Sequence, residues 1–174
     1  MKYDVLIIGG GPVGNYLASL LARDFNVAVV ERKTSFGGKA CTGIIGGAEN
    51  YERLGLPEKA VLNQLRGERS FIREYRALKS RESPPQAYVV DRKTLEKELA
   101  KSAVKKGADY FMGTTFQGFK NGKAVLSHMN ERLEVEASFY VGADGVASTV
   151  AKNIGASTKA EFLTGYEIEV VGGV

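Results

Sequence analysis

Apolar runs and one amphipathic segment alternate at the start of the chain. Tyr3–Ile8 is a nearly continuous aliphatic run, which is typical of a strand buried on both faces of a parallel sheet. Pro12–Arg23 has helical spacing, with its proline in the first turn, where the missing N–H costs nothing. The expected apolar stripe of this helix consists of Val13, Leu17, Leu20 and Leu21, and Ala18 and Ala22 are expected to allow close packing. Asn26–Val30 is a second apolar run, so residues 1–33 predict a βαβ unit.

The pattern becomes polar and glycine-rich in the next third of the chain. Residues 34–47 (TSFGGKACTGIIGG) follow neither a helical nor a strand period and predict a loop. Ala48–Leu54 predicts one or two helical turns. Strands are expected around Phe71–Tyr75 and at Gln86–Val90, with a loop at Ser83–Pro85 between them.

A longer helix and a series of strands follow. Asp91 is a suitable N-cap for a helix that runs to about Lys106 and ends at Gly107. The expected strands after it are Ala108–Met112, then an antiparallel meander of Thr115–Lys120, Lys123–His128 and Arg132–Ala137, then Phe139–Ala143. A short helix from about Ser148 and a strand at Tyr166–Val171 complete the pattern. These elements predict an α/β fold with a parallel sheet, helices and an antiparallel β-meander.

Composition narrows the function classes. The 174 residues are 44% hydrophobic and 25% charged, as in globular proteins. The net charge of +4 suits an anionic partner such as a phosphorylated cofactor or an acidic membrane surface. Nucleic-acid binding is not expected, because no basic run is interleaved with aromatic residues.

The scarcity of cysteine and histidine excludes several chemistries. One cysteine, Cys41, excludes an intrachain disulfide and multi-cysteine metal sites. One histidine, His128, removes most metal-ligand and Ser-His constellations, so no metal site is expected. Tyr3–Ile8 is too short for a signal-peptide core or a membrane span, so a cytoplasmic location is expected.

The most informative motif is Gly9-x-Gly11-x-x-Gly14, between the first strand and the first helix. Gly9 allows a tight turn, Gly11 lets a pyrophosphate approach the backbone, and Gly14 lets the helix pack close to the strand. The phosphates then lie at the helix N-terminus, where N–H groups and the helix dipole favour an anion. The alternative is a glycine-rich turn that binds no ligand.

Glu31 ends the second strand, where a carboxylate accepts hydrogen bonds from the ribose hydroxyls of an adenosine. A carboxylate there disfavours a 2′-phosphate, so FAD or NAD is expected rather than NADP. The neighbouring Arg32 and Lys33 weaken this preference slightly.

A second strand–turn–helix motif follows the expected strand Phe139–Ala143, at Asp144-Gly145. A long two-part cofactor such as FAD needs a second site of this kind, whereas a nicotinamide cofactor does not. The alternative is a turn whose aspartate caps the following helix.

Together, the motifs resemble a known family. Gly9–Gly14 (GGGPVG), Glu31–Arg32, Val90–Arg92 and Gly142–Gly145 (GADG) resemble, in order and spacing, the FAD-dependent oxidoreductases of the para-hydroxybenzoate hydroxylase type. Within that group, the loop Gly37–Ile45 (GGKACTGII) looks like the cysteine-containing flavin loop of the geranylgeranyl reductase family. The resemblance covers essentially the whole chain.

The resemblance implies roles for individual residues. The glycine turn holds the pyrophosphate and Glu31 the adenosine ribose, while Arg92 reaches the phosphate or ribityl region. The backbone near Phe116 meets the adenine, and Asp144 and Gly145 close on the flavin. The complete set of residues expected to bind the cofactor is Gly9, Gly11, Pro12, Val13, Gly14, Glu31, Arg32, Cys41, Thr42, Gly43, Arg92, Phe116, Asp144 and Gly145.

The loop around Cys41 is expected to lie beside the isoalloxazine. Cys41 is the one candidate catalytic residue, either as a redox or proton-donating group or as a small residue that fits there. The family usually carries a proline and an arginine just before the cysteine, whereas this chain has Gly38-Lys39-Ala40. That departure leaves the substrate preference open.

The resemblance also predicts the domain organisation. Residues 1–174 are expected to be the N-terminal part of an FAD-binding domain, and residues 160–174 to begin a substrate-binding sheet whose remainder lies beyond Val174. Within the domain, the expected parts are the βαβ unit 1–33, the flavin loop 34–47 and the segment 91–145 with the helix, meander and Asp-Gly motif.

The function that the resemblance implies is FAD-dependent reduction of isoprenoid (geranylgeranyl) C=C bonds in lipid biosynthesis, because the flavin supplies the hard redox step. The expected electron donor is NAD(P)H or ferredoxin. The lipid substrate implies peripheral contact with a membrane. The alternatives are a flavin hydroxylase, a halogenase, an electron-transfer dehydrogenase, a non-catalytic FAD-binding fragment and an NAD-only dehydrogenase.

Overall fold

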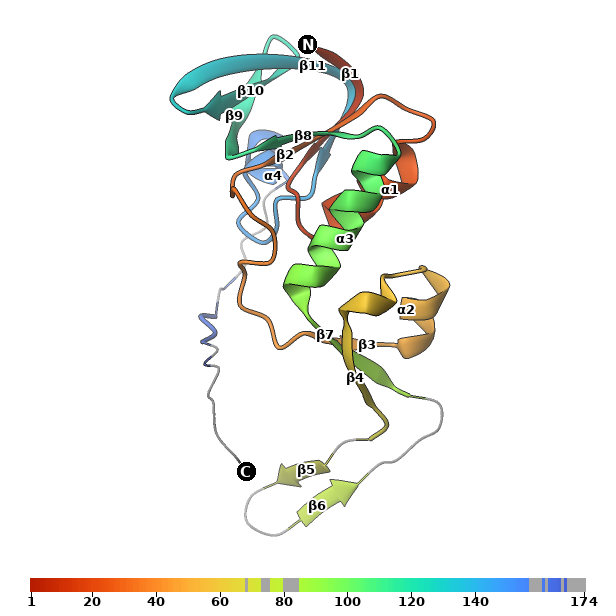
Figure 1. Ribbon diagram of the computed structural model, residues 1–174. Helices are drawn as coiled ribbons and strands as arrows, with labels where there is room; N and C mark the ends of the chain where they lie inside the picture. Colours follow the sequence, from red (N-terminus) through yellow and green to blue (C-terminus); the bar gives the residue numbers. More distant parts are fainter. Residues whose placement is uncertain are drawn as a thin grey trace. The chain divides into compact units, whose positions relative to one another are not determined.

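The computed structural model describes residues 1–67, 69–72, 76–79, 85–156, 161, 163–166 and 168 (Figure 1). The chain forms two compact units. Unit 1 consists of Met1–Gly38 and Glu96–Phe162, and unit 2 of Lys39–Leu95 and Leu163–Val174. The glycine turn and the Asp-Gly motif lie in unit 1, and the Cys41 loop lies in unit 2.

Unit 1 is built on a six-stranded mixed sheet with strand order β8-β2-β1-β11-β10-β9 (Figure 1). In that order, the strands are Asp109–Met112, Val27–Glu31, Lys2–Ile8, Glu131–Gly142, Lys123–His128 and Thr114–Lys120. The pairs β8–β2, β2–β1 and β1–β11 are parallel, and β11–β10 and β10–β9 are antiparallel. The predicted α/β fold, with a parallel sheet continued by a meander, is confirmed.

Strand β11 corrects the sequence prediction of two separate strands at Arg132–Ala137 and Phe139–Ala143. It is one 12-residue strand, which pairs antiparallel with β10 at Glu131–Val135 and parallel with β1 from Glu136 onward. One continuous strand therefore joins the meander to the parallel sheet.

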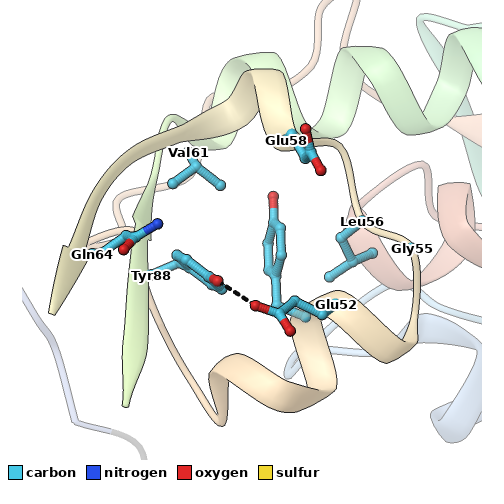
Figure 2. A pocket seen from close by; sticks show the side chains of 8 residues that line it. Glu52, Gly55, Leu56, Glu58, Val61, Gln64 and Tyr88 are labelled. Atoms are coloured by element: carbon cyan, nitrogen blue, oxygen red, sulfur yellow. Dashed lines mark hydrogen bonds between the residues drawn. The ribbon is translucent and has the colours of Figure 1, made fainter. Parts of the chain in front are cut away.

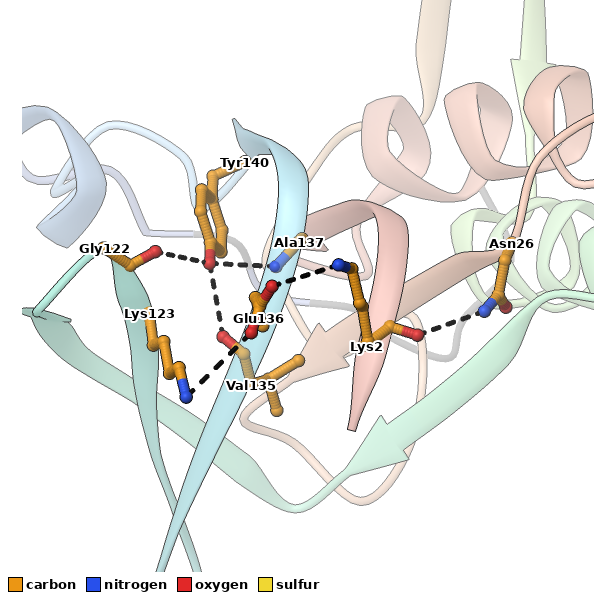
Figure 3. A network of polar contacts seen from close by, with 8 residues as sticks. All are labelled: Lys2, Asn26, Gly122, Lys123, Val135, Glu136, Ala137 and Tyr140. Carbon is orange, nitrogen blue, oxygen red and sulfur yellow. Dashed lines mark hydrogen bonds and ion pairs between the residues drawn. The ribbon is translucent and has the colours of Figure 1, made fainter.

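Side-chain contacts connect β1, β10 and β11 at the point where β11 changes its pairing from β10 to β1 (Figure 3). The Tyr140 hydroxyl accepts a hydrogen bond from the Ala137 N–H at 3.0 Å and donates to the Gly122 carbonyl oxygen at 2.8 Å. Glu136 lies between Lys2 of β1, at 3.3 Å, and Lys123 of β10, at 3.9 Å. These ion pairs are exposed, so their contribution to stability is small.

Helix α1 (Pro12–Leu21) packs on the sheet through its small residues rather than through the predicted leucine stripe. Its buried residues are Gly14, Asn15, Ala18 and Ser19. Val13 and Leu20 are 72% and 53% exposed, so their predicted place in the core was wrong, whereas Leu17 and Leu21 contact it. Small residues occupy the face of α1 that packs on the sheet, because they let the helix axis approach the sheet closely.

Helix α3 (Arg92–Lys105) begins and ends as predicted. The Asp91 carboxylate accepts hydrogen bonds from the Lys93 N–H, at 3.0 Å, and from the Thr94 hydroxyl. The hydrogen bond from Thr94 is the main reason why the pKa of Asp91 lies below its ordinary value. Gly107, with φ of +107°, follows the helix.

The buried side chains of unit 1 form two clusters. One includes Ala18 and Ala22 beside α3 residue Ala103 and the sheet residues Val5, Ile7, Val27 and Val29. The other joins the parallel strands to the meander and to α4 (Thr149–Asn153) through Leu6, Ile8, Phe116, Leu126, Val135 and Val150. The glycine turn therefore follows a strand, β1, that is buried on both faces.

Unit 2 contains a three-stranded antiparallel sheet of order β3-β7-β4, formed by Ile44–Gly46, Ala87–Val90 and Val61–Leu65. A separate two-stranded ribbon is formed by β5 (Arg69–Ile72) and β6 (Arg76–Lys79). Helix α2 (Ala48–Arg53) and a 3₁₀ turn (Glu58–Ala60) precede β4. The helix at 48–54 and the strand at 86–90 were predicted.

Other predictions for this region need correction. The loop 34–47 contains the short strand β3, and neither β4 nor β6 was predicted. Three residues are too few to show a period, and most of β4 is exposed, so it lacks an apolar pattern. Tyr166 and Ile168 lie in no strand. The remaining predictions for Tyr75, for Ser83-Pro84 and for most of Tyr166–Val171 fall outside the described residues.

None of the helices in the described part of the chain has the length and apolar composition that crossing a membrane requires.

Alkaline pH should weaken unit 1 through Tyr3, which is 8% exposed and donates to Asp109 of β8 at 2.9 Å. Burial, and next the hydrogen bond to Asp109, raise the pKa of Tyr3 from 10.0 to about 12. The folded state then holds a proton that the unfolded chain releases. The stabilisation is complete below pH 10, and we expect the free energy of unfolding to fall as pH rises from 10 to about 12.

Urea unfolding at several pH values measures this effect, with Tyr3→Phe as the comparison. Phenylalanine keeps the ring but cannot titrate, so its pH dependence should be shallower over the same range. Equal pH dependence in both proteins would contradict the prediction.

Candidate cofactor-binding site

The turn between β1 and α1 brings three segments of unit 1 together. Gly9 has φ of +112°, and a Cβ placed on it would lie 2.3 Å from the Ala143 carbonyl oxygen at the end of β11. A Cβ on Gly14 would lie 1.9 Å from the Gly9 carbonyl oxygen. The Ala143 N–H also donates to the Ile8 carbonyl at 2.7 Å. Gly9 and Gly14 are therefore required by the fold, and the Asp-Gly motif begins beside the glycine turn.

Gly11 differs from these two glycines. A Cβ placed on it would meet no atom of the described residues within 4 Å, and its φ of −75° is ordinary for any residue. It is the N-cap of α1, whose first turn holds no acidic side chain. The N-terminus of this ten-residue helix favours an anion through its N–H groups and its dipole. The space at Gly11, which a side chain would fill, leaves room for the predicted approach of a pyrophosphate.

Glu31 lies beside this turn, as predicted. Its two carboxylate oxygens accept from the Gly10 N–H at 2.7 Å and from the Lys33 N–H at 2.9 Å. These bonds hold the half-buried carboxylate in place, and each oxygen keeps a further lone pair that can accept from a ribose hydroxyl. Arg32 is exposed next to it.

The side chain of Asp144 helps to cap the first turn of helix α4, whose N-cap residue is Ser148. One carboxylate oxygen accepts from the Ser148 hydroxyl at 2.6 Å, and the other from the Thr149 and Val150 N–H groups at 2.6 and 3.1 Å. The capping role raised as the alternative is therefore present. Gly145, with φ of +81°, has open space at its Cβ position among the described residues. Contact of this motif with a cofactor stays a prediction.

Phe116 does not present its ring to a ligand. The ring is 6% exposed and packs in the core against Phe119, with centroids 5.0 Å apart. The β9–β10 ladder shifts register beside it, because Val125 pairs with Gly118 and Leu126 with Phe116. This β-bulge leaves Gln117 out of the ladder. The predicted contact between backbone near Phe116 and the adenine stays a prediction.

The remaining predicted residues lie in unit 2. Gly43 has φ of +73°, and a Cβ on it would lie 2.4 Å from the Val90 carbonyl oxygen, so packing against β7 requires glycine. Cys41 and Thr42 are exposed, and the Cys41 Sγ atom accepts from the Gly43 N–H at 3.5 Å. Arg92 is the half-buried first residue of α3. Their roles toward a flavin stay predictions.

Asn15, a completely buried residue of α1, was not among the predicted site residues. Its Nδ2 atom donates to the Gly10 carbonyl at 2.8 Å and to the Glu96 carbonyl at 3.2 Å. Its Oδ1 atom accepts from the Tyr110 hydroxyl at 3.0 Å. A polar amide directly after Gly14 is the signal that could have drawn attention to it.

Unit 2 also contains a cavity of about 440 Å³ (Figure 2). The Tyr88 hydroxyl donates to Glu52 at 2.6 Å beside it, and this hydrogen bond is the main cause that raises the pKa of Tyr88. The cavity is lined by Tyr51, Glu52, Gly55, Leu56, Glu58, Val61, Gln64 and Tyr88. None of these lining residues is a predicted cofactor-binding residue.

The glycine turn at a helix N-terminus, the carboxylate that ends β2 and the parallel sheet define a dinucleotide-binding protein of the Rossmann type. The chain belongs to the FAD binding domain family, and the match to this family covers residues 2–173. The expectation of FAD as the cofactor is therefore confirmed.

Named relatives support the narrower resemblance. A digeranylgeranylglycerophospholipid reductase of Methanosarcina mazei is 29% identical over 168 residues, which are 90% of this chain and 41% of the relative. An uncharacterized protein of Methanocaldococcus jannaschii is 31% identical over 97% of this chain and 44% of its own length. The crystal structure of a geranylgeranyl bacteriochlorophyll reductase-like protein from Thermoplasma acidophilum has a TM-score of 0.78 at 27% identity, covering 94% of this chain and 44% of that one. The chain spans less than half the length of each.

Proposed function

We propose that this chain is the FAD-binding part of a reductase that saturates C=C bonds in isoprenoid chains of lipids. The observation that carries the proposal is the similarity to a digeranylgeranylglycerophospholipid reductase over 90% of the chain. The fold similarity to a geranylgeranyl bacteriochlorophyll reductase-like protein, with a TM-score of 0.78, agrees with it.

Bound FAD supplies hydride transfer, so the residues of this chain have to bind and orient it. The N-terminus of α1 at Gly11 binds the pyrophosphate, and Glu31 accepts from the adenosine ribose. Cys41 is the candidate residue beside the flavin, where it either donates the proton that the second alkene carbon needs or fills a small space. Comparing the activity of Cys41→Ser with that of Cys41→Ala in the full-length enzyme separates these two roles. Serine keeps a group that can donate a proton, whereas alanine only fills the space.

The test uses the full-length gene product loaded with FAD, under anaerobic conditions, with a geranylgeranyl lipid in detergent. Dithionite, NADPH and reduced ferredoxin are compared as electron donors. Mass spectrometry should show a gain of two hydrogens for each double bond saturated. If the flavin is reduced but no donor produces this gain, the proposal is wrong. A gain of oxygen in air would instead identify a hydroxylase.

Glu31→Gln should lower the affinity for FAD about 10-fold, because a charged acceptor of ribose hydroxyls becomes a neutral one. Isothermal titration calorimetry with the purified chain measures the affinity. Glu131→Gln, an exposed glutamate of β11, is the matched control and should not change it. FMN lacks the adenosine, so its binding should be equal in the variant and the original chain. Equal FAD affinity after Glu31→Gln would contradict the ribose contact.

A further inference from the structure

The peptide bond between Gly10 and Gly11 lies at the expected phosphate site and is flanked by two glycines. Glycine adopts many backbone conformations, so this peptide group can rotate more easily than one between residues with side chains. A phosphate-binding N–H has to point in one direction before the ligand arrives, because ordering it on binding would reduce affinity. Some other group therefore has to hold this peptide in place.

Asn15 contacts this peptide directly. Its amide nitrogen donates to the Gly10 carbonyl oxygen at 2.8 Å, inside the protein. Since a trans peptide is planar, its C=O and N–H point in opposite directions. When the Gly10 carbonyl points inward to Asn15, the Gly11 N–H points away from Asn15. The Cβ position of Gly11 is open among the described residues, which leaves room for an anion near that N–H.

The orientation of the Asn15 amide is itself determined by its neighbours. The Gly10 and Glu96 carbonyl oxygens can only accept, so both require the NH₂ end. The Tyr110 hydroxyl, 3.0 Å from Oδ1, donates to the other end. Burial raises the pKa of Tyr110, so this hydroxyl keeps its proton throughout the physiological range. One neighbouring residue, Gly10, and two residues distant in sequence, Glu96 and Tyr110, thus fix one side chain.

We infer that Asn15 is a positioning residue for FAD, which holds the Gly10–Gly11 peptide so that its N–H faces the pyrophosphate. Tyr110 supports it by orienting the amide. The inference rests on FAD binding at the glycine turn but not on the isoprenoid substrate. It deepens the proposed function by assigning a residue to the preorganisation of the phosphate site.

The test compares the original chain with Asn15→Leu, which has similar bulk, carries no charge and cannot donate. Calorimetry measures the affinities for FAD, ADP and adenosine, and urea unfolding measures stability. We expect Asn15→Leu to weaken FAD and ADP at least 10-fold and to leave adenosine, which has no phosphate, within about twofold. A merely structural role would weaken adenosine and ADP equally, and that result would overturn the inference.

Tyr110→Phe keeps the test informative if Asn15→Leu does not fold. It retains the ring and both hydrogen bonds that Asn15 donates but removes the hydroxyl that donates to Oδ1, so the amide is held less firmly. We expect a smaller loss in the same sense, about 3-fold for ADP and none for adenosine. Unchanged ADP affinity in Tyr110→Phe would contradict the supporting role. If the original chain binds adenosine but not ADP, the phosphate site itself is wrong, whatever its activity on lipids.

Discussion

Gly14→Ala is expected to destabilise unit 1 by about 3 kcal/mol, a large share of the stability of a typical domain. The added Cβ would lie 1.9 Å from the Gly9 carbonyl oxygen and 3.3 Å from the Ile7 Cγ2 atom. The Gly9 carbonyl oxygen is a backbone atom and cannot move without shifting the glycine turn, so α1 has to move off the sheet. Alanine is the better helix former by about 1 kcal/mol, but this gain is smaller than the clash.

Urea unfolding followed by circular dichroism measures the effect, and the slope m shows whether the unfolded states are comparable. Gly46→Ala is the matched control, because a Cβ there meets no atom of the described residues within 4 Å. The control should unfold at the same urea concentration as the original chain. If Gly14→Ala also did so, α1 and β1 would not be as close as the structure places them.

The sequence predicted those features of unit 1 that depend on neighbouring residues. The βαβ unit, the Asp91 cap and the hairpin between β9 and β10 are each encoded within a few consecutive positions. Gly9, Gly14 and Glu31 follow from the same local logic, since turn, helix and strand end lie within one contiguous segment. The structure brings these residues together as the sequence analysis expected.

Features that depend on distant partners were missed. Strand β11 is continuous because β10 pairs with its first half and β1 with its second, which no local pattern reveals. Asn15 bonds to residues 81 and 95 positions away, so its role depends on tertiary packing. The predicted apolar stripe of α1 was wrong for Val13 and Leu20, which are exposed, whereas the predicted close packing at Ala18 and Ala22 is confirmed.

Asp144 shows why a motif can be located correctly while its role stays open. The motif lies next to Gly9, as a second cofactor contact requires, yet the carboxylate is used by the first turn of α4. Helix capping and cofactor contact are both compatible with the motif Gly142–Gly145. Capping by an aspartate and contact with a cofactor through the backbone of the next glycine are compatible, so sequence alone could not separate them.

Gly11→Ala should weaken FAD binding and leave stability unchanged, whereas Gly14→Ala is expected to lower stability. The φ of −75° suits alanine, and no atom of the described residues lies within 4 Å of the new methyl group, so stability should be unchanged. The methyl group would, however, occupy the space in which a pyrophosphate approaches the helix N-terminus. We expect the affinity for FAD to fall about 100-fold, or about 2.7 kcal/mol.

Two measurements on the same Gly11→Ala sample test this profile. Urea unfolding without ligand should match the original chain, and calorimetry should show the loss of FAD affinity. Adenosine should bind equally to both proteins, because its proposed contact is with Glu31 and not with Gly11. A variant with unchanged stability and unchanged FAD affinity would move the pyrophosphate away from α1. The glycine would then be explained by neither packing nor binding, since a Cβ on Gly11, unlike one on Gly9 or Gly14, meets no atom of the described residues within 4 Å.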